Sequence, residues 1–329
     1  RRRQRARRGR RPVTDVRLPV GDVQFSVRAA VLCVRDGHLL TNTGVDERGD
    51  PFWFPLGGAL GTGQDAVTAA AREWAEETGW PAGPLTLAGI GESVFTMNGR
   101  PHHELTYYSR MDAPTGFPTG AFGVLDDDRF TCEWLPLTAL GSRPRLEAQV
   151  RAMLDAPPGT LAHVVQREDG WTAPPGTPDV RFPLGGLKFS VRVAILCVRG
   201  DRVLTNAADG LPFHFLPGGA LGAGEDTATA AAREWIEETG VPPGPLRLVG
   251  VVENFFGRPE KRQHELGFYY RMDAPDTLPD TPFAVKDNGD VTCQWVPVAE
   301  WAQTPVYPLA AASLLDVPAG DYRHIVSRG

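Results

Sequence analysis

The chain contains the same series of short segments twice, about 160 residues apart. Stacked repeats have periods of about 20 to 50 residues, so each copy is predicted to be a whole domain. A length of 329 residues allows two domains that each bury their own core. The matched segments are residues 25–28 with 189–192, 103–105 with 264–266, and 131–134 with 292–295.

The repeat and the composition predict four regions. Residues 1–14 form an Arg-rich tail, which we expect to be disordered because it is highly charged and has few apolar residues. The two domains are expected at 15–165 and 179–329. The linker between them, 166–178, contains Pro174, Pro175 and Pro178 and is expected to be stiff.

The charge distribution separates the tail from the rest of the chain. Eight of the first eleven residues are Arg, and without them 26 basic residues face 40 acidic ones. Clustered guanidinium groups can bind a polyanion, so one hypothesis is that the tail binds RNA. The alternative is that the tail is a disordered extension without a binding role. The acidic body argues against nucleic-acid binding as the main function.

The positions of the cysteines and the hydropathy of the chain predict where in the cell the protein is found. The four cysteines, Cys33, Cys132, Cys197 and Cys293, lie in apolar, strand-like runs, which favours buried free thiols over disulfides. No segment reaches about 18 consecutive apolar residues, so no membrane association is expected. We therefore expect a cytoplasmic protein.

Three glutamates in the second copy indicate the chemistry. Glu234, Glu237 and Glu238 are spaced i, i+3 and i+4, so on a helix all three carboxylates project from one face. Like charges at this spacing repel one another, and a bound divalent cation is the natural compensation. Carboxylates without His or Cys favour Mg²⁺, or Mn²⁺, over Zn²⁺.

The residues around these glutamates carry a recognisable pattern. A glycine loop precedes the helix, Asp226 or Thr227 can cap it, and Gly240 is a stop signal. Residues 219–241 resemble in full the signature of the Nudix hydrolases, G-x5-E-x7-R-E-hydrophobic-x-E-E-x-G-hydrophobic. The first copy, residues 58–80, has the same signature with Gln64 in place of Glu225.

The resemblance implies the fold class, α/β, with two tandem Nudix-type α/β/α sandwiches that have mixed sheets. The sequence pattern of the second copy agrees with this fold. Strands are expected at 189–198, 202–205, 246–254, 267–272 and 291–298. Helices are expected at 225–239 and 309–315, and the counterpart of the last one at 146–154.

The resemblance also implies metal-assisted attack of water on a phosphorus atom of a nucleotide. Glu234, Glu237 and Glu238 become the metal ligands, and Arg233 and Glu225 support them. A further carboxylate is expected from outside the signature, with Glu265 and Glu253 as candidates. The equivalents in the first copy are the following: Glu73, Glu76, Glu77, Arg72, Glu104 and Glu92.

Several residues are candidates for substrate binding. Gly218 and Gly219, with Gly57 and Gly58 in the first copy, allow the backbone to approach a ligand closely. Arg192 and its counterpart Arg28 can bind a phosphate or a base edge, or can simply be exposed on a sheet. His264 can contact substrate or act as a base, although a structural histidine beside a strand is the commoner situation.

These assignments predict a Mg²⁺-dependent pyrophosphohydrolase that acts on nucleoside triphosphates or nucleotide sugars, mainly in the second copy. The first copy is expected to be weaker or differently specific, because Gln64 replaces a carboxylate and Pro55 stands one position earlier than Pro217. Family analogy suggests that the copies pair as an intramolecular pseudo-dimer, and whole chains can also associate further. The alternative is a nucleotide-sensing or scaffold protein with little catalysis.

Overall fold

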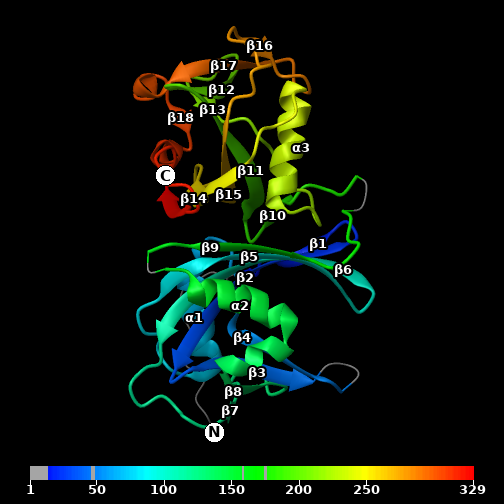
Figure 1. Cartoon of the computed structure of the whole chain (residues 1–329), viewed down its shortest axis with the longest axis vertical. Coiled ribbons are helices and arrows are strands. Elements are labelled where there is room, and N and C mark those ends of the chain that lie inside the picture. Colours follow the sequence, from blue (N-terminus) through cyan, green and yellow to red (C-terminus); the bar gives the residue numbers. More distant parts are fainter. Residues whose placement is uncertain (1–13, 46–48, 158, 174–175) are drawn as a thin grey trace.

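A computed structural model describes residues 14–45, 49–157, 159–173 and 176–329. The chain forms two α/β domains, each built on one mixed sheet. Figure 1 shows them stacked along the long axis, with the first domain below and the second above. The predicted Arg-rich tail, apart from Thr14, and the predicted linker residues Pro174 and Pro175 lie outside the described residues.

The sheet of the first domain has two long parallel strands at its centre, β2 and β6. A second parallel pair, β5 with β9, forms one edge, and the remaining pairs are antiparallel. The order of the described strands is β7 (Phe122–Gly123), β8 (Thr131–Pro136), β3 (His38–Val45), β4 (Pro51–Ala59), β2 (Val23–Arg35), β6 (Arg100–Asp112), β5 (Thr86–Met97) and β9 (Ala162–Arg167), with β1 (Arg17–Val20) against β2. Strand β9 continues two residues into the range predicted as linker.

The second sheet repeats this arrangement with one local difference. The segment that corresponds to the long strand β4 contains only the short β13 (His214–Phe215), which pairs with β12 and β18. The order of the described strands is β16 (Phe283–Ala284), β17 (Val291–Pro297), β12 (Arg202–Ala208), β11 (Leu187–Arg199), β15 (Gln263–Asp273), β14 (Arg247–Phe256) and β19 (Arg323–Arg328), with β10 (Arg181–Leu184) against β11 and with β18 at Val306–Tyr307.

One helix of each domain carries the signature carboxylates: α1 (Ala66–Thr78) and α3 (Thr227–Thr239). The prediction of a helix from residue 225 was two residues too early, because Asp226 is extended and acts as the N-cap. Its carboxylate accepts the amide of Thr229 at 3.1 Å. The predicted stop at Gly240 is confirmed, since this residue has a φ of 68°.

The opposite face of each sheet is covered differently in the two domains. In the first domain it is covered by α2 (Pro144–Asp155), with Pro144 in the first turn. In the second domain the predicted helix at 309–315 is a 3₁₀ helix, η3 (Leu309–Leu314). It lies between Pro308 and Pro318, which leaves little room for a regular α-helix. Two more 3₁₀ segments are η1 (Leu137–Ser142) and η2 (Val298–Glu300).

The apolar core continues from one domain into the other. A single cluster of buried side chains includes Phe25 and Trp74 of the first domain together with Phe189 and Trp235 of the second. All four cysteines are free and buried, as predicted. Burial raises the pKa of each of these thiols to about 12.

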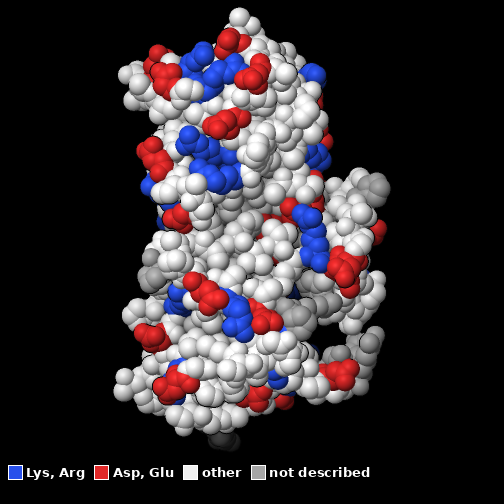
Figure 2. Space-filling view, in the orientation of Figure 1, with Lys and Arg blue, Asp and Glu red and all other residues white. Residues whose placement is uncertain are grey.

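The surface in Figure 2 mixes charges of both signs. Lys and Arg side chains lie among Asp and Glu side chains on this face, and the band between the domains is mostly uncharged. Among the described residues, no helix is long and apolar enough to cross a membrane.

Candidate functional site

The glycine loop before each signature helix is fixed by close backbone contacts. Gly218 has a φ of +131°, and a Cβ atom there would lie 2.2 Å from the carbonyl oxygen of Val193. Gly57 has a φ of +132° and the same conflict with Ala29 at 2.1 Å. No other residue type fits these positions without a backbone shift, because L-residues rarely adopt such φ values.

The next glycine of each loop makes room for a carboxylate. A Cβ atom on Gly219 would lie 2.0 Å from Glu234 Oε2, and one on Gly58 would lie 2.2 Å from Glu73 Oε2. The first glutamate of the signature helix therefore packs directly on the loop. A ligand that binds the loop amides would also lie next to this carboxylate.

Glu238 is held by the loop and by a strand. Its carboxylate accepts the amide of Gly218 at 3.2 Å and the side-chain amide of Asn206, also at 3.2 Å. Glu77 has the equivalent bonds from Gly57 at 2.9 Å and from Asn42 at 2.8 Å. Burial raises the pKa of Glu238 and of Glu77 to about 7, although these bonds and a nearby Arg oppose the shift.

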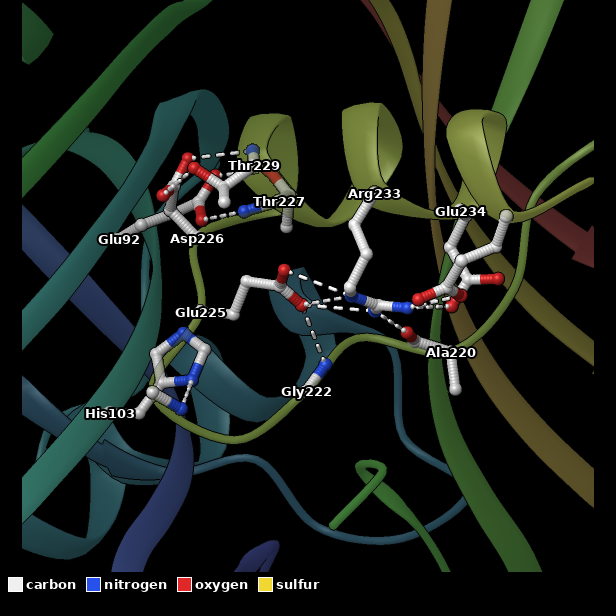
Figure 3. Close-up of polar contacts among 12 residues, drawn as sticks. Glu92, His103, Ala220, Gly222, Glu225, Asp226, Thr227, Thr229, Arg233 and Glu234 are labelled. Carbon is white, nitrogen blue, oxygen red and sulfur yellow. Dashed lines mark hydrogen bonds and ion pairs between the residues drawn. The ribbon is translucent and has the colours of Figure 1, made fainter. Parts of the chain in front are cut away.

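Arg233 joins the carboxylates of the second domain, as Figure 3 shows. Its Nη1 donates to Glu234 at 2.8 Å and to Glu237 at 3.0 Å. Its Nη2 donates to Glu225 at 3.0 Å and to the carbonyl of Ala220 at 3.1 Å. Burial favours the neutral guanidinium, but the bonds and charges of Glu225 and Glu234 raise the pKa of Arg233.

Arg72 is the counterpart in the first domain and has one carboxylate fewer. It contacts Glu73 at 2.6 Å and Glu76 at 2.9 Å, and it donates to the carbonyl of Ala59 at 2.9 Å. The Glu225 position is taken by Gln64, whose Oε1 accepts from Nε at 3.2 Å. Substitution of the carboxylate thus leaves a neutral hydrogen bond in place of an ion pair.

The arginines expected to bind substrate contact the glycine loops. Nη2 of Arg192 donates to the carbonyls of Leu216 and Gly218, each at 3.0 Å. In the first domain, Nη2 of Arg28 donates to Pro55 at 3.0 Å and to Gly57 at 2.7 Å. These bonds hold the backbone of the loop from the strand beside it.

Two of the candidates for a further metal carboxylate lie on the central parallel strands. Glu104, on β6, accepts bonds from Ser26 at 3.3 Å and from Thr106 at 3.0 Å. Glu265, on β15, has the equivalent place beside Ser190. Within the described parts of the chain, no hydrogen bond or ion pair joins either residue to the carboxylates of the signature helices.

The structure places Glu253, Glu92 and His264 at the contact between the domains. All three are fully buried. Glu253 accepts the amide of Ala66 in the first domain, and Glu92 accepts the amide of Thr227 in the second. His264 accepts the amide of Gly63 at 3.2 Å. These three residues thus contact the beginning of the other domain's helix.

The chemistry of the donors fits a hard divalent cation, because the signature helices supply only carboxylate oxygens. In the second domain three carboxylates contact one guanidinium, which leaves an excess of negative charge. Across residues 14–329, apart from the undescribed gaps, no three His, Cys, Asp or Glu side chains converge on one point. In the second domain Arg233 holds Glu234 and Glu237, and Glu238 faces the loop.

Sequence reasoning missed Asn42 and Asn206. Each is buried and donates to a signature glutamate, and its Oδ1 accepts from the thiol of Cys132 or Cys293 at 3.2 Å. A signal was present, because both copies place a Thr-Asn pair in an apolar strand, at 41–42 and 205–206. Two buried polar residues at matched positions of a repeat indicate a shared site.

Comparison with known families agrees with this geometry. The model of the NUDIX domain matches residues 24–156 and again residues 188–316, which together are most of the chain. The chain therefore belongs to the Nudix hydrolase family and contains two tandem Nudix domains.

Parts of the chain are similar to bacterial proteins of solved structure. A mutator MutT protein from Bacillus halodurans is 15% identical, with 45% of this chain and 93% of that chain covered and a TM-score of 0.34. A MutT NUDIX hydrolase from Burkholderia pseudomallei is 26% identical, with coverages of 35% and 85% and a TM-score of 0.30. The ORF135 protein of E. coli is 22% identical, with coverages of 41% and 92% and a TM-score of 0.29. No curated protein matches the chain.

Proposed function

We propose that the chain is a Mg²⁺-dependent pyrophosphohydrolase for nucleoside diphosphates linked to another group, with its main site in the second domain. One observation carries the proposal. Arg233 binds the carboxylates of Glu225, Glu234 and Glu237 beside the glycine loop, and Glu238 accepts the amide of Gly218 in that loop. Such a set of carboxylates beside a glycine loop suits a metal-bound phosphate chain.

In this proposal Glu234, Glu237 and Glu238 hold the cation, which neutralises phosphate charge and makes a bound water molecule more acidic. One of these carboxylates is proposed also to accept a proton from that water molecule. Arg233 keeps the carboxylates in place when no cation is present. The loop amides that follow Gly218 orient the phosphates, and Arg192 holds the loop.

The first domain is proposed to be weaker, since Gln64 gives Arg72 a neutral partner. The two domains are proposed to act as an intramolecular pseudo-dimer, which their shared apolar core supports. Nucleoside triphosphates and nucleotide sugars such as ADP-ribose both remain in the proposed substrate class.

The test is phosphate and pyrophosphate release from a panel of these nucleotides, with Mg²⁺ or Mn²⁺, for the intact chain and for Glu238→Gln. We expect metal-dependent turnover that falls about 100-fold in the variant. The matched control is Glu300→Gln, the same change at an exposed position of η2. Binding of a nucleotide without any turnover would instead favour the sensing protein.

A further inference from the structure

The helix of the proposed main site begins against the other domain. Glu92 Oε2 accepts the amide of Thr227 at 2.9 Å, and Oε1 accepts the hydroxyl of Thr227 at 2.5 Å. His103 Nδ1 accepts the amide of Gly224 at 3.0 Å. Figure 3 shows both side chains at the loop that leads into α3. An amide at a helix N-terminus has no partner within its own helix, so a carboxylate there is stabilising.

Glu92 is kept in this position by its own domain. His163 of the first domain donates from Nε2 to Glu92 Oε1 at 2.6 Å. Thr227 is held in the same way by its own domain, because its hydroxyl contacts that of Tyr270 at 2.7 Å. Burial alone would raise the pKa of Glu92, but the bonds from His163 and Thr227 lower it, so the ionised form is favoured. Arg167, at the end of β9, also pairs with the helix cap Asp226.

A continuous series of contacts joins this junction to the metal-binding face. Glu225 lies between Gly224, which His103 holds, and the cap Asp226. Its carboxylate accepts the amide of Gly222 at 3.3 Å and the guanidinium of Arg233. Arg233 in turn holds Glu234 and Glu237. A shift of the junction would therefore move the residues that orient the proposed metal ligands.

The reverse contacts occur at the first domain. Both carboxylate oxygens of Glu253 accept the amide of Ala66, at 3.1 and 2.9 Å. Its Oε1 also accepts a hydrogen bond from His324 Nε2 at 2.6 Å. His264 accepts the amide of Gly63, and Arg328 pairs with the cap Asp65 at 2.7 Å. The two sets are equivalent in the repeat except that Ala66 lacks the hydroxyl of Thr227.

We propose that each Nudix site is completed by the other domain. Glu92 and His103 are positioning residues for the site on α3, and Glu253 and His264 are positioning residues for the site on α1. This inference rests on the proposed function for the effect on turnover, but the contacts themselves can be tested without turnover.

The experiment uses the full chain with Glu92→Gln and, as its mirror image, Glu253→Gln. Gln has nearly the same size but lacks the charge. Hydrogen exchange is measured over residues 222–230 and over residues 61–69. We expect Glu92→Gln to speed exchange only in the second-domain segment and Glu253→Gln only in the first-domain segment. Exchange that rises in the mutated residue's own domain, in both segments or in neither overturns the proposal.

A second measurement separates positioning from general damage. In chains whose first site is silenced by Glu77→Gln, Glu92→Gln should lower kcat or raise the half-saturating Mn²⁺ concentration about tenfold, as lost outer contacts of metal sites do. Glu253→Gln in the same background should change both values much less, because its partner Ala66 lies at the silenced site. Equal effects of the two variants would indicate a structural role and overturn the proposal.

The two proposals fail in different ways. If the chain releases no phosphate from any nucleotide, the proposed function fails, whereas the crossed pattern of hydrogen exchange still tests the positioning role. If turnover is robust but the crossed pattern is absent, only the positioning role fails.

Discussion

The beginnings of α3 and α1 have nearly the same backbone but different charge. In the second domain Arg233 lies among carboxylates that include Glu225, whereas in the first domain Arg72 meets Gln64. Asp226 and Asp65 cap their helices in the same way. The fold of the site therefore does not depend on the carboxylate at this position. That carboxylate adds negative charge, and so we expect it to affect cation affinity more than stability.

The strongest test of the comparison removes two ligands from one domain at a time. Glu234→Gln with Glu238→Gln should lower total turnover about 100-fold or more, because the carboxylates stabilise charge at the reacting phosphate. Glu73→Gln with Glu77→Gln should lower it by less than about twofold if the second domain dominates. Steady-state kinetics on the best substrate gives the answer. A larger loss from the first-domain pair would reverse our assignment of the main site.

The next test asks whether the two interface histidines are equivalent. Burial lowers the pKa of His103 and of His264 to about 4, whereas an unfolded His titrates near 6.5. Between these values the unfolded chain binds more protons, so the free energy of unfolding falls as the pH is lowered from about 6.5 to about 4. At pH 5 we expect a loss of about 2 kcal/mol per histidine.

Urea unfolding at pH 5 and pH 7.5 measures this dependence. His103→Gln keeps a hydrogen-bond acceptor but cannot be protonated, so it should make the pH dependence shallower. His264→Gln should do the same by a similar amount. A variant with the slope of the original chain would show that its histidine does not remain neutral in the folded protein.

The difference between Glu225 and Gln64 can itself be removed. Glu225→Gln makes the second domain resemble the first, and the loss of the ion pairs with Arg233 should reduce its turnover about tenfold. The Mg²⁺ concentration needed for half-maximal rate should rise in parallel. Titration with Mg²⁺ at saturating substrate measures both effects. A fall in turnover without any change in Mg²⁺ dependence would contradict a role in cation affinity.

The smallest effect is expected from the opposite substitution, Gln64→Glu, which makes the first domain resemble the second. In a chain with Glu238→Gln, the further change Gln64→Glu should raise the remaining first-domain turnover about threefold, since Arg72 regains a charged partner. Initial rates with Mg²⁺ are sufficient to detect this gain. If no gain occurs, the difference between the domains lies in the loop, where Pro55 and Pro217 stand at different positions.

Much of the fold could be predicted from the sequence, because the repeat divides the chain and the signature fixes the helix and its loop. The two helices, their Asp caps and their glycine stops are properties of short segments. The 3₁₀ helix η3 was harder to predict, since its apolar residues fit an α-helix and only the flanking prolines oppose one. Helix α2 covers the equivalent face in the first domain.

The contacts of Glu92, Glu253 and the interface histidines could not be derived from sequence. A Glu or His on a strand near a signature suggests a ligand, and the sequence does not reveal which domain its side chain meets. The partners are distant along the chain: Glu92 contacts Thr227, and Glu253 contacts Ala66. Such pairs depend on how two complete domains pack. Prediction from local patterns therefore ended at the boundary between the copies.

The exchange of carboxylates between the domains has a consequence for how this gene can change. If Glu92 supports the helix of the second domain, then selection on the second copy also preserves part of the first, even where the first has no substrate of its own. Loss of either half by deletion, or its replacement by recombination, would leave the first amide of the other half's helix, at Ala66 or Thr227, without its carboxylate partner. The duplication is then difficult to reverse. The first domain can acquire a new specificity only through substitutions at residues that do not contact the second domain.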